Sequence, residues 1–478
     1  MSQLLADCLD EIFEYLEDDM TNLHSCLLVN RLWCEISVKI FWRSVLNYCT
    51  SNFRTLIACL PNESKEILNR NGINISTPTS KPPIFKYASF CKILSIYRFH
   101  YKLELFLKDQ RTISLQNLNN NAYIITQEIF KLYFNQIGSL KKLDLWQYPN
   151  IIFNFYPGAK DCLKNLTELH CSSNFSSDFF YQLSKICHNI LSLDITVVQV
   201  ISNGLTDLIS CQKNLRSFSI TQFDELTNTV PLLMLKLPNT LIKLNIYGEN
   251  YISLSLIAKF TNLQELNLLC NYNEDFIDFE KLQFAIFPKL QVLKIQRACP
   301  KYDLLIRFLE NGKNLKEFYV GDDEGYSDNS LNLAIAKFCP NLRKLSVGFK
   351  NNELESLKIV LKSCQYLESI KIWCGGEFLS EKDALEMFVN YSNKNTYEII
   401  LYHLYYTRSE LLPEDLESFF ISWSNRVPQK PLSLIIVNYG ANSLDTNNEN
   451  MKIIEKYVKL GVIKRFKVTD FDYEEFIY

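Results

Sequence analysis

The sequence contains few of the residues that build phosphate-binding or metal-binding loops. Only 13 of its 478 residues are glycine, and the phosphate-loop pattern Gly-x-x-x-x-Gly-Lys does not occur. The five histidines are scattered, and neither His-Glu-x-x-His nor Gly-x-Ser-x-Gly is present. We therefore expect no enzyme activity, no bound metal and no cofactor.

The chain also lacks a long apolar run and a basic amino-terminal segment. Its first twenty residues contain seven Asp or Glu residues and no Lys or Arg, the opposite of a signal peptide. No stretch approaches the length of about 18 apolar residues that a membrane span needs. The net charge of −3 gives no basic surface for nucleic acid or anionic lipid. The sequence predicts a cytoplasmic or nuclear protein that binds neither nucleic acid nor membrane.

Cysteine is more frequent, yet no Cys-x-x-Cys pair occurs among the 15 cysteines. Five cysteines recur at one position, three or four residues before the aliphatic residue that opens a repeat: Cys162, Cys187, Cys211, Cys339 and Cys364. A small, weakly polar side chain recurring at the end of a helix favours buried packing over metal binding or redox chemistry. Reduced thiols are typical of the compartment inferred above.

An apolar pattern, Leu-x-x-Leu-x-Leu, repeats along most of the chain. Successive instances start 22 to 27 residues apart. Ten instances are complete: Leu140/Leu143/Leu145, Leu166/Leu169/Cys171, Ile190/Leu193/Ile195, Leu215/Phe218/Ile220, Leu241/Leu244/Ile246, Leu263/Leu266/Leu268, Leu290/Leu293/Ile295, Leu315/Phe318/Val320, Leu342/Leu345/Val347 and Leu367/Ile370/Ile372. Weaker instances follow at Tyr397/Ile400/Tyr402, Leu432/Ile435/Val437 and Ile463/Phe466/Val468. This period is that of a leucine-rich repeat, one short strand and a helical return.

The repeat predicts an α/β leucine-rich-repeat solenoid. Alternation of apolar and polar residues indicates strands, and helical spacing lies between them. Strands stacked in parallel with helices behind them curl into a horseshoe, with the strands on the concave face and the helices on the convex face. Asn precedes the first aliphatic residue in six units, where it is expected to bond the backbone of the turn: Asn165, Asn189, Asn214, Asn262, Asn314 and Asn341.

The residues before the array follow a different pattern. Residues 1–46 predict a small module of three amphipathic helices, the first with Leu5, Leu9, Ile12, Phe13 and Leu16 on one face. Residues 47–100 are interpreted as a helical connector with a Pro-rich loop, and residues 101–478 as the array with degenerate terminal repeats.

The amino-terminal module resembles an F-box. The resemblance lies in three segments: residues 4–16 (LLADCLDEIFEYL), residues 27–33 (LLVNRLW) and residues 41–43 (FWR). The chain departs from the family pattern at Leu5, where a Pro is usual, and at Phe41, where a Leu is usual. The array resembles the cysteine-containing, ribonuclease-inhibitor-like repeats that commonly follow an F-box, most closely at Cys339-Pro340-Asn341-Leu342.

These resemblances imply a substrate-recognition subunit of a Skp-cullin-F-box type ubiquitin ligase. The F-box would bind a Skp-type adaptor, and through it a cullin ligase, while the repeats would bind an unidentified target protein. Two alternatives stay open: a repeat scaffold whose first helices only cap the array, and an inhibitor that wraps its target.

Two sets of contact residues follow. The first is apolar and lies in the F-box-like module, where some members must be core and others must face the adaptor: Leu5, Leu9, Ile12, Leu16, Leu27, Val29 and Trp33. The second points outward from the strands by alternation and would bind the target: Trp146, His170, Asp194, Tyr247, Lys294, Tyr319, Lys371 and Trp373.

Overall fold

The structure is a computed structural model that describes most of the chain. The described residues are 6–77, 83–110, 117–146, 156–222, 230–248, 254–270, 279–321, 325–404, 406–407, 411–426, 430–438 and 440–469. The chain divides into two compact units, residues 1–222 with 232–238 and residues 223–231 with 239–478, called unit 1 and unit 2 below. The predicted Pro-rich loop falls mainly outside the described residues.

Unit 1 begins with three helices, as predicted. They are α1 (Ala6–Glu14), α2 (Met20–Cys26) and α3 (Arg31–Phe41). Asp19 caps α2 by accepting a hydrogen bond from the N–H of Asn22, and Asn30 caps α3 by accepting one from the N–H of Trp33. These two polar residues therefore divide the amphipathic segment into separate helices.

The rest of unit 1 alternates helices and strands. Its helices are α4 (Thr50–Ala58), α5 (Asn62–Arg70), α6 (Ile96–Lys108), α7 (Leu118–Gln136), α8 (Ala159–Leu163), α9 (Ser177–Ser184) and α10 (Asn203–Ser210), with short 3-10 turns η1 (Val45–Asn47) and η2 (Tyr87–Phe90). Its strands are β1 (Ile93–Ser95), β2 (Lys142–Asp144), β3 (Glu168–Ser172), β4 (Ser192–Val197) and β5 (Ser217–Gln222), each parallel to the next.

Unit 2 continues the same alternation. Its strands are β6 (Lys243–Gly248), β7 (Glu265–Cys270), β8 (Val292–Gln296), β9 (Glu317–Val320), β10 (Lys344–Ser346), β11 (Ser369–Cys374), β12 (Glu398–His403), β13 (Leu432–Asn438) and β14 (Ile463–Thr469). Its helices are α12 (Tyr302–Glu310), α13 (Asn329–Phe338), α14 (Leu354–Ser363), α15 (Glu381–Tyr391), α16 (Pro413–Ser424) and α17 (Asn448–Lys459), with turns η5 (Leu254–Lys259), η6 (Phe279–Lys281) and η7 (Leu444–Thr446). Helix α11 (Val230–Lys236) contains residues of both units.

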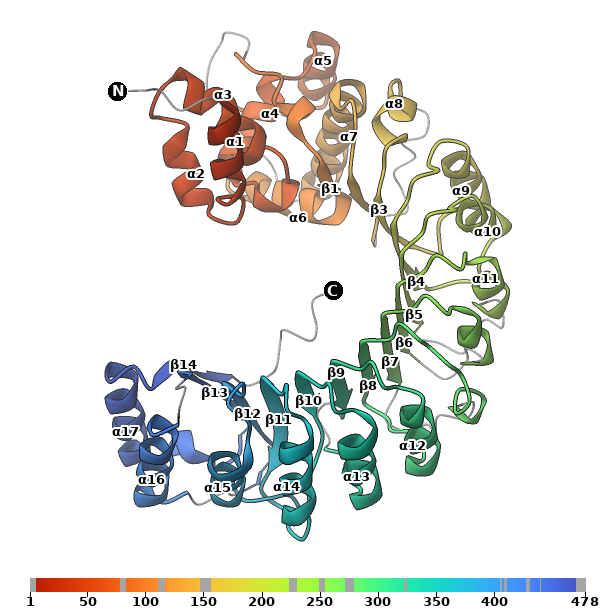
Figure 1. Cartoon of the computed structure of the whole chain (residues 1–478). Coiled ribbons are helices and arrows are strands. Elements are labelled where there is room, and N and C mark those ends of the chain that lie inside the picture. Colours follow the sequence, from red (N-terminus) through yellow and green to blue (C-terminus); the bar gives the residue numbers. More distant parts are fainter. Residues whose placement is uncertain are drawn as a thin grey trace. The chain divides into compact units, whose positions relative to one another are not determined.

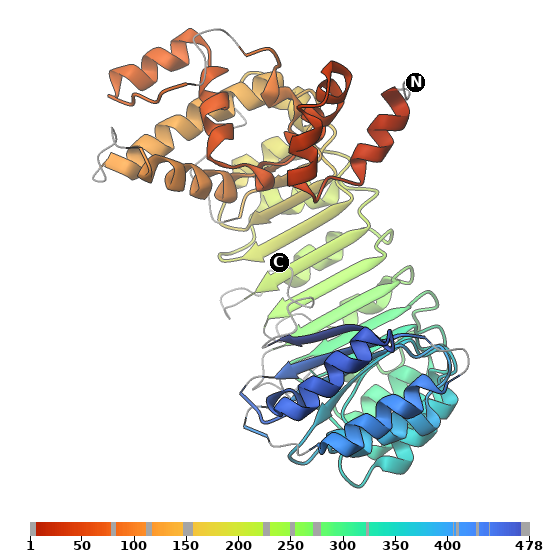
Figure 2. The same cartoon turned by 90° about the vertical axis from the view of Figure 1, so that its left-hand side faces the viewer.

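Both units have the layers of a leucine-rich-repeat solenoid. Within each unit the strands lie on one side and the helices that follow them on the other, as Figure 1 shows for β4 and β5 with α9 and α10 in unit 1 and for β9 to β11 with α12 to α14 in unit 2. In Figure 2 the yellow-green strands of unit 1 are seen in front of the helices that follow them. All strands pair in parallel with their neighbours inside a unit. The side of the strands without helices is called the strand face below. The predicted α/β repeat fold is confirmed.

The apolar repeat positions form the core. All three positions of the ten complete repeats are buried, with exposed fractions between 0% and 4%. Shared acceptors also tie neighbouring repeats together: the N–H groups of Thr167 and Glu168 both donate to the carbonyl of Lys141. The same pair of bonds joins Leu191 and Ser192 to the carbonyl of Thr167. Burial and backbone pairing thus repeat with the period of the sequence.

The array begins earlier than the sequence predicts. Strand β1 lies in the segment interpreted as a connector, and the predicted boundary at residue 100 falls inside α6. The N–H groups of Lys92 and Ile93 donate to the carbonyl of Arg43 at 2.8 and 3.1 Å, and Ser44 forms a parallel bridge with Ile93. The residues that follow α3 therefore occupy the position of a first repeat strand. A short, irregular strand leaves little apolar periodicity, which is why the sequence did not reveal it.

In two of the weaker repeats, the side chains predicted to lie in the core lie on the strand face instead. Sequence matching assigns Ile400 and Tyr402 to the core, but in β12 the buried core residues are Ile399 and Leu401. In β13 the register places Leu434 and Ile436 beside Ile399 and Leu401, so Ile435 and Val437 also lie on the strand face. The prediction for these two strands is wrong because both of their faces are apolar. Strand β14 has Phe466 and Val468 on the predicted side.

The recurring cysteines and asparagines hold the turns between helix and strand. Burial raises the pKa of the Cys162, Cys187, Cys339 and Cys364 thiols to about 12. These thiols are therefore protonated packing groups, as predicted. Asn262, Asn314 and Asn341 donate from Nδ2 to a carbonyl of the preceding repeat at 2.8, 2.8 and 3.2 Å. The predicted bond from asparagine to the turn is confirmed at these three positions.

Among the described residues, no helix is both long and apolar enough to cross a membrane.

Candidate functional sites

The three amino-terminal helices separate their apolar side chains into two groups. One group forms a core, made of Leu9, Phe13, Leu23, Cys26, Ile36 and Ile40, against which Leu16, Leu32, Trp33 and Phe41 pack partly buried. The second group is open to solvent: Ile12 (48% exposed), Tyr15 (91%), Leu28 (78%) and Val29 (55%). A module of this size that leaves four large apolar side chains in water has the composition of a partner-binding surface.

The structure sorts the predicted adaptor contacts. Leu9 is only 2% exposed and belongs to the core, so it is removed from the predicted contact set. Ile12 and Val29 are exposed, whereas Leu16, Leu27 and Trp33 are half-buried. Trp33 stands edge-on to Phe13 with their ring centroids 5.0 Å apart, as a core anchor does. Leu5 lies outside the described residues.

Sequence reasoning missed the two most exposed members of this surface. Tyr15 and Leu28 lie next to predicted contact residues in the sequence, but their spacing does not follow the apolar stripe of a helix. Because its ring carries a hydroxyl group, Tyr15 does not stand out as an apolar position in the sequence. Leu28 lies in the turn between α2 and α3, where a run of apolar residues does not reveal which side chain points outward.

A salt bridge joins the helical module to the first repeat of unit 1. The guanidinium of Arg43 donates from Nη1 and Nη2 to the Glu14 carboxylate at 2.6 and 2.5 Å, and Glu17 lies 3.3 Å from Nη1. These bonds lower the pKa of Glu14, with burial opposing them. Because the carbonyl of Arg43 also receives the N–H groups of Lys92 and Ile93, one residue connects α1 to the strand ladder.

The strand face of unit 1 carries a row of polar residues on neighbouring strands. The register places Asp144 beside His170, and His170 beside Asp194. The Nδ1 of His170 lies 3.1 Å from Oδ1 of Asp144, and the same oxygen accepts a hydrogen bond from the N–H of Trp146 at 3.0 Å. Oδ2 of Asp144 accepts one from Ser95 Oγ at 2.7 Å. Three strands therefore bring two carboxylates to one imidazole.

The charges of this row influence one another. Burial alone would lower the pKa of His170, but its bond to Asp144 and the charges of Asp194 and Asp144 raise it above its usual range. Burial raises the pKa of Asp194, which the charge of His170 opposes. Burial would also raise the pKa of Asp144, but hydrogen bonds from His170, Ser95 and Trp146 lower it. The histidine is thus stabilised as a cation between two carboxylates.

Trp146 completes the predicted site in unit 1. Its ring is nearly parallel to that of His170, with an interplanar angle of 15° and a centroid distance of 6.3 Å, and it stands edge-on to Tyr97 at 5.9 Å. Trp146, His170 and Asp194 are all half-buried. The structure therefore brings three of the eight predicted target contacts together on one open surface.

In unit 2 the predicted contacts fall into two groups. Lys294 and Tyr319 are half-buried neighbours across β8 and β9, with the ammonium 4.6 Å from the centre of the ring. Tyr247, on β6, is half-buried as well, and the structure does not group it with these two residues.

Lys371 and Trp373 are not on an open surface. Lys371 is 3% exposed and Trp373 is fully buried, so the prediction that their side chains are exposed on the strand face is wrong. Trp373 forms an apolar cluster with Phe378, Tyr402 and Val437, although three of these four residues lie on the strand face. The ammonium of Lys371 lies 5.4 Å from the ring centre of Trp373.

Loops that follow the strands cover this part of unit 2. The loop after β11 pairs with the loop after β10, since Asn351 donates to the carbonyl of Glu377 at 3.0 Å and Leu379 to that of Phe349 at 3.1 Å. Phe378 is thereby laid against Trp373. On the other side, a Cβ added to Gly325 would come within 2.7 Å of both the Trp373 and Phe378 side chains. The strand face is closed here by side chains of the chain itself.

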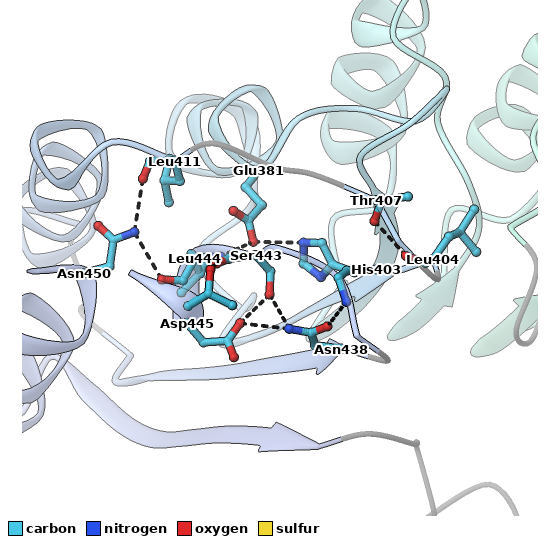
Figure 3. A network of polar contacts seen from close by, with 12 residues as sticks. Glu381, His403, Leu404, Thr407, Leu411, Asn438, Ser443, Leu444, Asp445 and Asn450 are labelled. Atoms are coloured by element: carbon cyan, nitrogen blue, oxygen red, sulfur yellow. Dashed lines mark hydrogen bonds and ion pairs between the residues drawn. The ribbon is translucent and has the colours of Figure 1, made fainter. Parts of the chain in front are cut away.

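A buried polar network lies next to the closed region, and its chemistry is structural (Figure 3). His403 Nε2 lies 2.9 Å from Oε1 of Glu381, both side chains are fully buried, and the same oxygen accepts the N–H of Leu444 at 3.1 Å. Asn450 donates to the carbonyls of Leu411 and Leu444 at 3.1 and 3.2 Å. These bonds join α15, β12, η7 and α17, which stabilises the last repeats. Neither the His403 imidazole nor the Glu381 carboxylate is exposed to solvent.

Similarity to known proteins is low. No protein-family model matches the sequence, and no curated protein matches it. Solved structures that share similarity include the leucine-rich repeat-containing protein LegL7 from Legionella pneumophila, which is 15% identical, with 66% of this chain and 90% of that chain covered and a TM-score of 0.33. The complex of Rad7 and Elc1 in yeast is 14% identical, with 84% and 94% covered and a TM-score of 0.36. The LRIM1/APL1C complex is 11% identical, with 70% and 60% covered and a TM-score of 0.22.

Proposed function

We propose that this chain is a non-enzymatic substrate receptor of a Skp-cullin-F-box type ubiquitin ligase. Its amino-terminal helices bind a Skp-type adaptor, and the strand faces of its repeats bind a target protein. The observation that carries the proposal is the exposed apolar group formed by Ile12, Tyr15, Leu28 and Val29. The resemblance of residues 4–46 to an F-box supports the adaptor as its partner.

The exposed group is not needed to complete the helical module. The core formed by Leu9, Phe13, Leu23 and the residues around them is already buried without it. Burying these four side chains in a partner would remove apolar area from water at roughly 25 cal/mol per Å². Burial of these side chains in a partner is therefore favourable.

A capping role for the same helices is compatible with this proposal. The Arg43 carbonyl starts the strand ladder, and the ring of Trp42 stands edge-on to that of Tyr48 with their centres 5.2 Å apart. The hydroxyl of Tyr48 accepts a hydrogen bond from that of Tyr133 at 3.1 Å. These contacts use residues after α3. They leave the exposed group on α1 and in the turn between α2 and α3 free for a partner.

The distinction between binding and capping can be tested with two matched substitutions in the full-length chain. Val29→Asp changes the exposed group, while Val200→Asp places the same charge at a similarly exposed valine outside the helical module (61% exposed). We expect the wild-type chain and Val200→Asp to co-elute with a Skp-type adaptor in size-exclusion chromatography. Val29→Asp should lose the complex while keeping the unfolding temperature of the wild-type chain.

Equal behaviour of the two variants would contradict the receptor function, as would a wild-type chain that forms no complex. Point substitutions are preferred to removing residues 1–46, because that deletion also removes the Arg43 carbonyl and the Ser44 bridge from the strand ladder. A truncated array could then fail for structural reasons.

A further inference from the structure

The strand face of unit 1 contains a buried hydroxyl, that of Ser172. Ser172 follows His170 by two residues in β3, so both side chains point to the same face, and the register places Ser172 beside Thr196 of β4. Ser172 is 3% exposed, and its Oγ has no hydrogen-bond partner among the described residues. A buried hydroxyl without a hydrogen-bond partner is destabilising, so its presence requires an explanation.

The carboxylate of Asp194 has capacity for a ligand as well. Asp144 accepts hydrogen bonds from His170, Ser95 and the N–H of Trp146, whereas among the described residues no donor bonds the side chain of Asp194. Its side chain is half-buried on the same face. Diagonal neighbours on adjacent strands have Cβ atoms roughly 7 to 8 Å apart, so one extended polar head group can reach both Asp194 and Ser172.

The net charge of this surface determines which kind of ligand it can bind. Asp144 and Asp194 carry two negative charges, and His170 can supply at most one positive charge between them. Lys142 and Glu168 neutralise each other nearby, with 3.3 Å between their charged atoms. The row therefore has an excess of negative charge and favours a cation. The ring of Trp146 offers an apolar and π-electron surface against which such a cation can lie.

We propose that this surface, formed by Asp194, Ser172 and Trp146, binds a basic side chain of the target protein. Asp194 pairs with the guanidinium or ammonium group, the Ser172 hydroxyl accepts one of its N–H donors after rotation about its Cα–Cβ bond, and the Trp146 ring covers the aliphatic stem. The inference rests on the proposed function in one respect only, namely that the strand face is where a target binds.

The histidine makes the binding depend on pH. His170 faces Asp144 and Lys142 on β2, Asp194 on β4 and Glu168 on its own strand. When His170 is protonated, its charge competes with an incoming cation for the two carboxylates. Binding of a basic side chain should therefore be weaker at about pH 6 than at about pH 8.

The test uses the full-length chain and a fluorescein-labelled peptide of about ten alternating Arg and Gly residues, followed by fluorescence anisotropy. Asp194→Asn should weaken binding roughly tenfold, because it removes the only charge in direct contact with the cation. Asp207→Asn, which removes the same charge from an exposed position on α10, is the matched control and should leave binding unchanged. A peptide of alternating Glu and Gly should not bind.

Ser172→Ala separates binding from stability. Because the hydroxyl has no partner in the described part of the chain, its removal should leave the midpoint of urea unfolding unchanged or raise it. Binding of the Arg-Gly peptide should nevertheless fall about two- to fivefold. A hydroxyl with a merely structural role would change stability and not binding.

The inference is overturned if Asp194→Asn and Asp207→Asn weaken binding equally, since the attraction would then come from the net charge alone. Binding of the Glu-Gly peptide, or unchanged binding by Ser172→Ala, would overturn it too. Adaptor binding is measured on the same samples by size exclusion. Loss of adaptor binding with retained peptide binding would refute the ligase function and leave this site standing, and the reverse result would refute only the site.

Discussion

Two tryptophans that occupy equivalent positions by sequence have opposite surroundings. Trp146 follows β2 in unit 1 and is half-buried on an open strand face beside His170. Trp373 lies in β11 of unit 2 and is fully buried under Phe378. Alternation along a strand therefore tells which side of the sheet a residue takes, but it does not tell whether that side is open.

The loops after the strands cause the difference. In unit 2 the segments around Gly325, Lys350 and Phe378 fold over the strand face, and a bridge between Lys350 and Phe378 joins two of them. Glu353 anchors the arrangement by accepting the N–H of Lys350 at 2.8 Å and the hydroxyl of Ser327. Because the closed face excludes water, strands β12 and β13 carry apolar residues on both sides.

The largest expected contrast comes from making the same substitution in the two regions. Trp373→Ala should lower the free energy of unfolding by about 3 to 5 kcal/mol, because it leaves a cavity under Phe378. Trp146→Ala should cost about 1 kcal/mol, since its ring is only half-buried, and should weaken binding of the Arg-Gly peptide. Chemical denaturation of both variants measures the contrast. Similar losses of stability would mean that the two faces are not open and closed as described.

A smaller effect is expected from adding one methyl group to the closed face. Gly325→Ala places a Cβ within 2.7 Å of Trp373 and Phe378, and relieving such overpacking typically costs about 1 to 3 kcal/mol. Gly138→Ala in unit 1 is the control, because its Cβ would meet nothing within 4 Å. Thermal unfolding should distinguish the two variants, with enhanced quenching of tryptophan fluorescence by acrylamide in Gly325→Ala alone. A neutral Gly325→Ala would indicate that the loop does not lie on Trp373.

The smallest effect concerns pH and the open face. The pKa of His170 is raised on folding, so its protonated form adds stability that is fully present below its ordinary pKa near 6.5 and is lost as the pH rises through the raised value. His170→Gln should therefore lose more stability, relative to the wild type, at about pH 5.5 than at about pH 8. The control is Asn267→Ala, which removes a side-chain amide from the strand face of unit 2. It should lower the stability by the same amount at both pH values. A His170→Gln loss that is independent of pH would contradict the assigned charge interactions.

The sequence was sufficient to predict the repeat fold because each unit carries the same local signal. The thirty core positions of the complete repeats are all buried, and the capping residues Asp19 and Asn30 separate the first helices as expected. The start of the array escaped prediction because Arg43 and Ser44 join the ladder through backbone groups alone. Backbone hydrogen bonds place no constraint on the side chain, so no pattern of residue types marks them.

The candidate contacts were predictable only in part, for a related reason. Trp146, His170 and Asp194 lie together because they belong to adjacent strands in matching register, which the repeat period already implies. Exposure depends instead on segments distant in sequence. Leu9 is covered by its neighbouring helices, and Trp373 is covered by the loop that carries Phe378. The apolar periodicity of the sequence predicts neither of these contacts.

Hydrogen exchange of the full-length chain, with and without a Skp-type adaptor, tests the central claim most directly. The account predicts that the adaptor slows exchange of backbone amides in α1 to α3, around the exposed Ile12, Leu28 and Val29, and leaves strands β2 to β5 unchanged. No protection within residues 6–41, or protection centred on the strands, would contradict it.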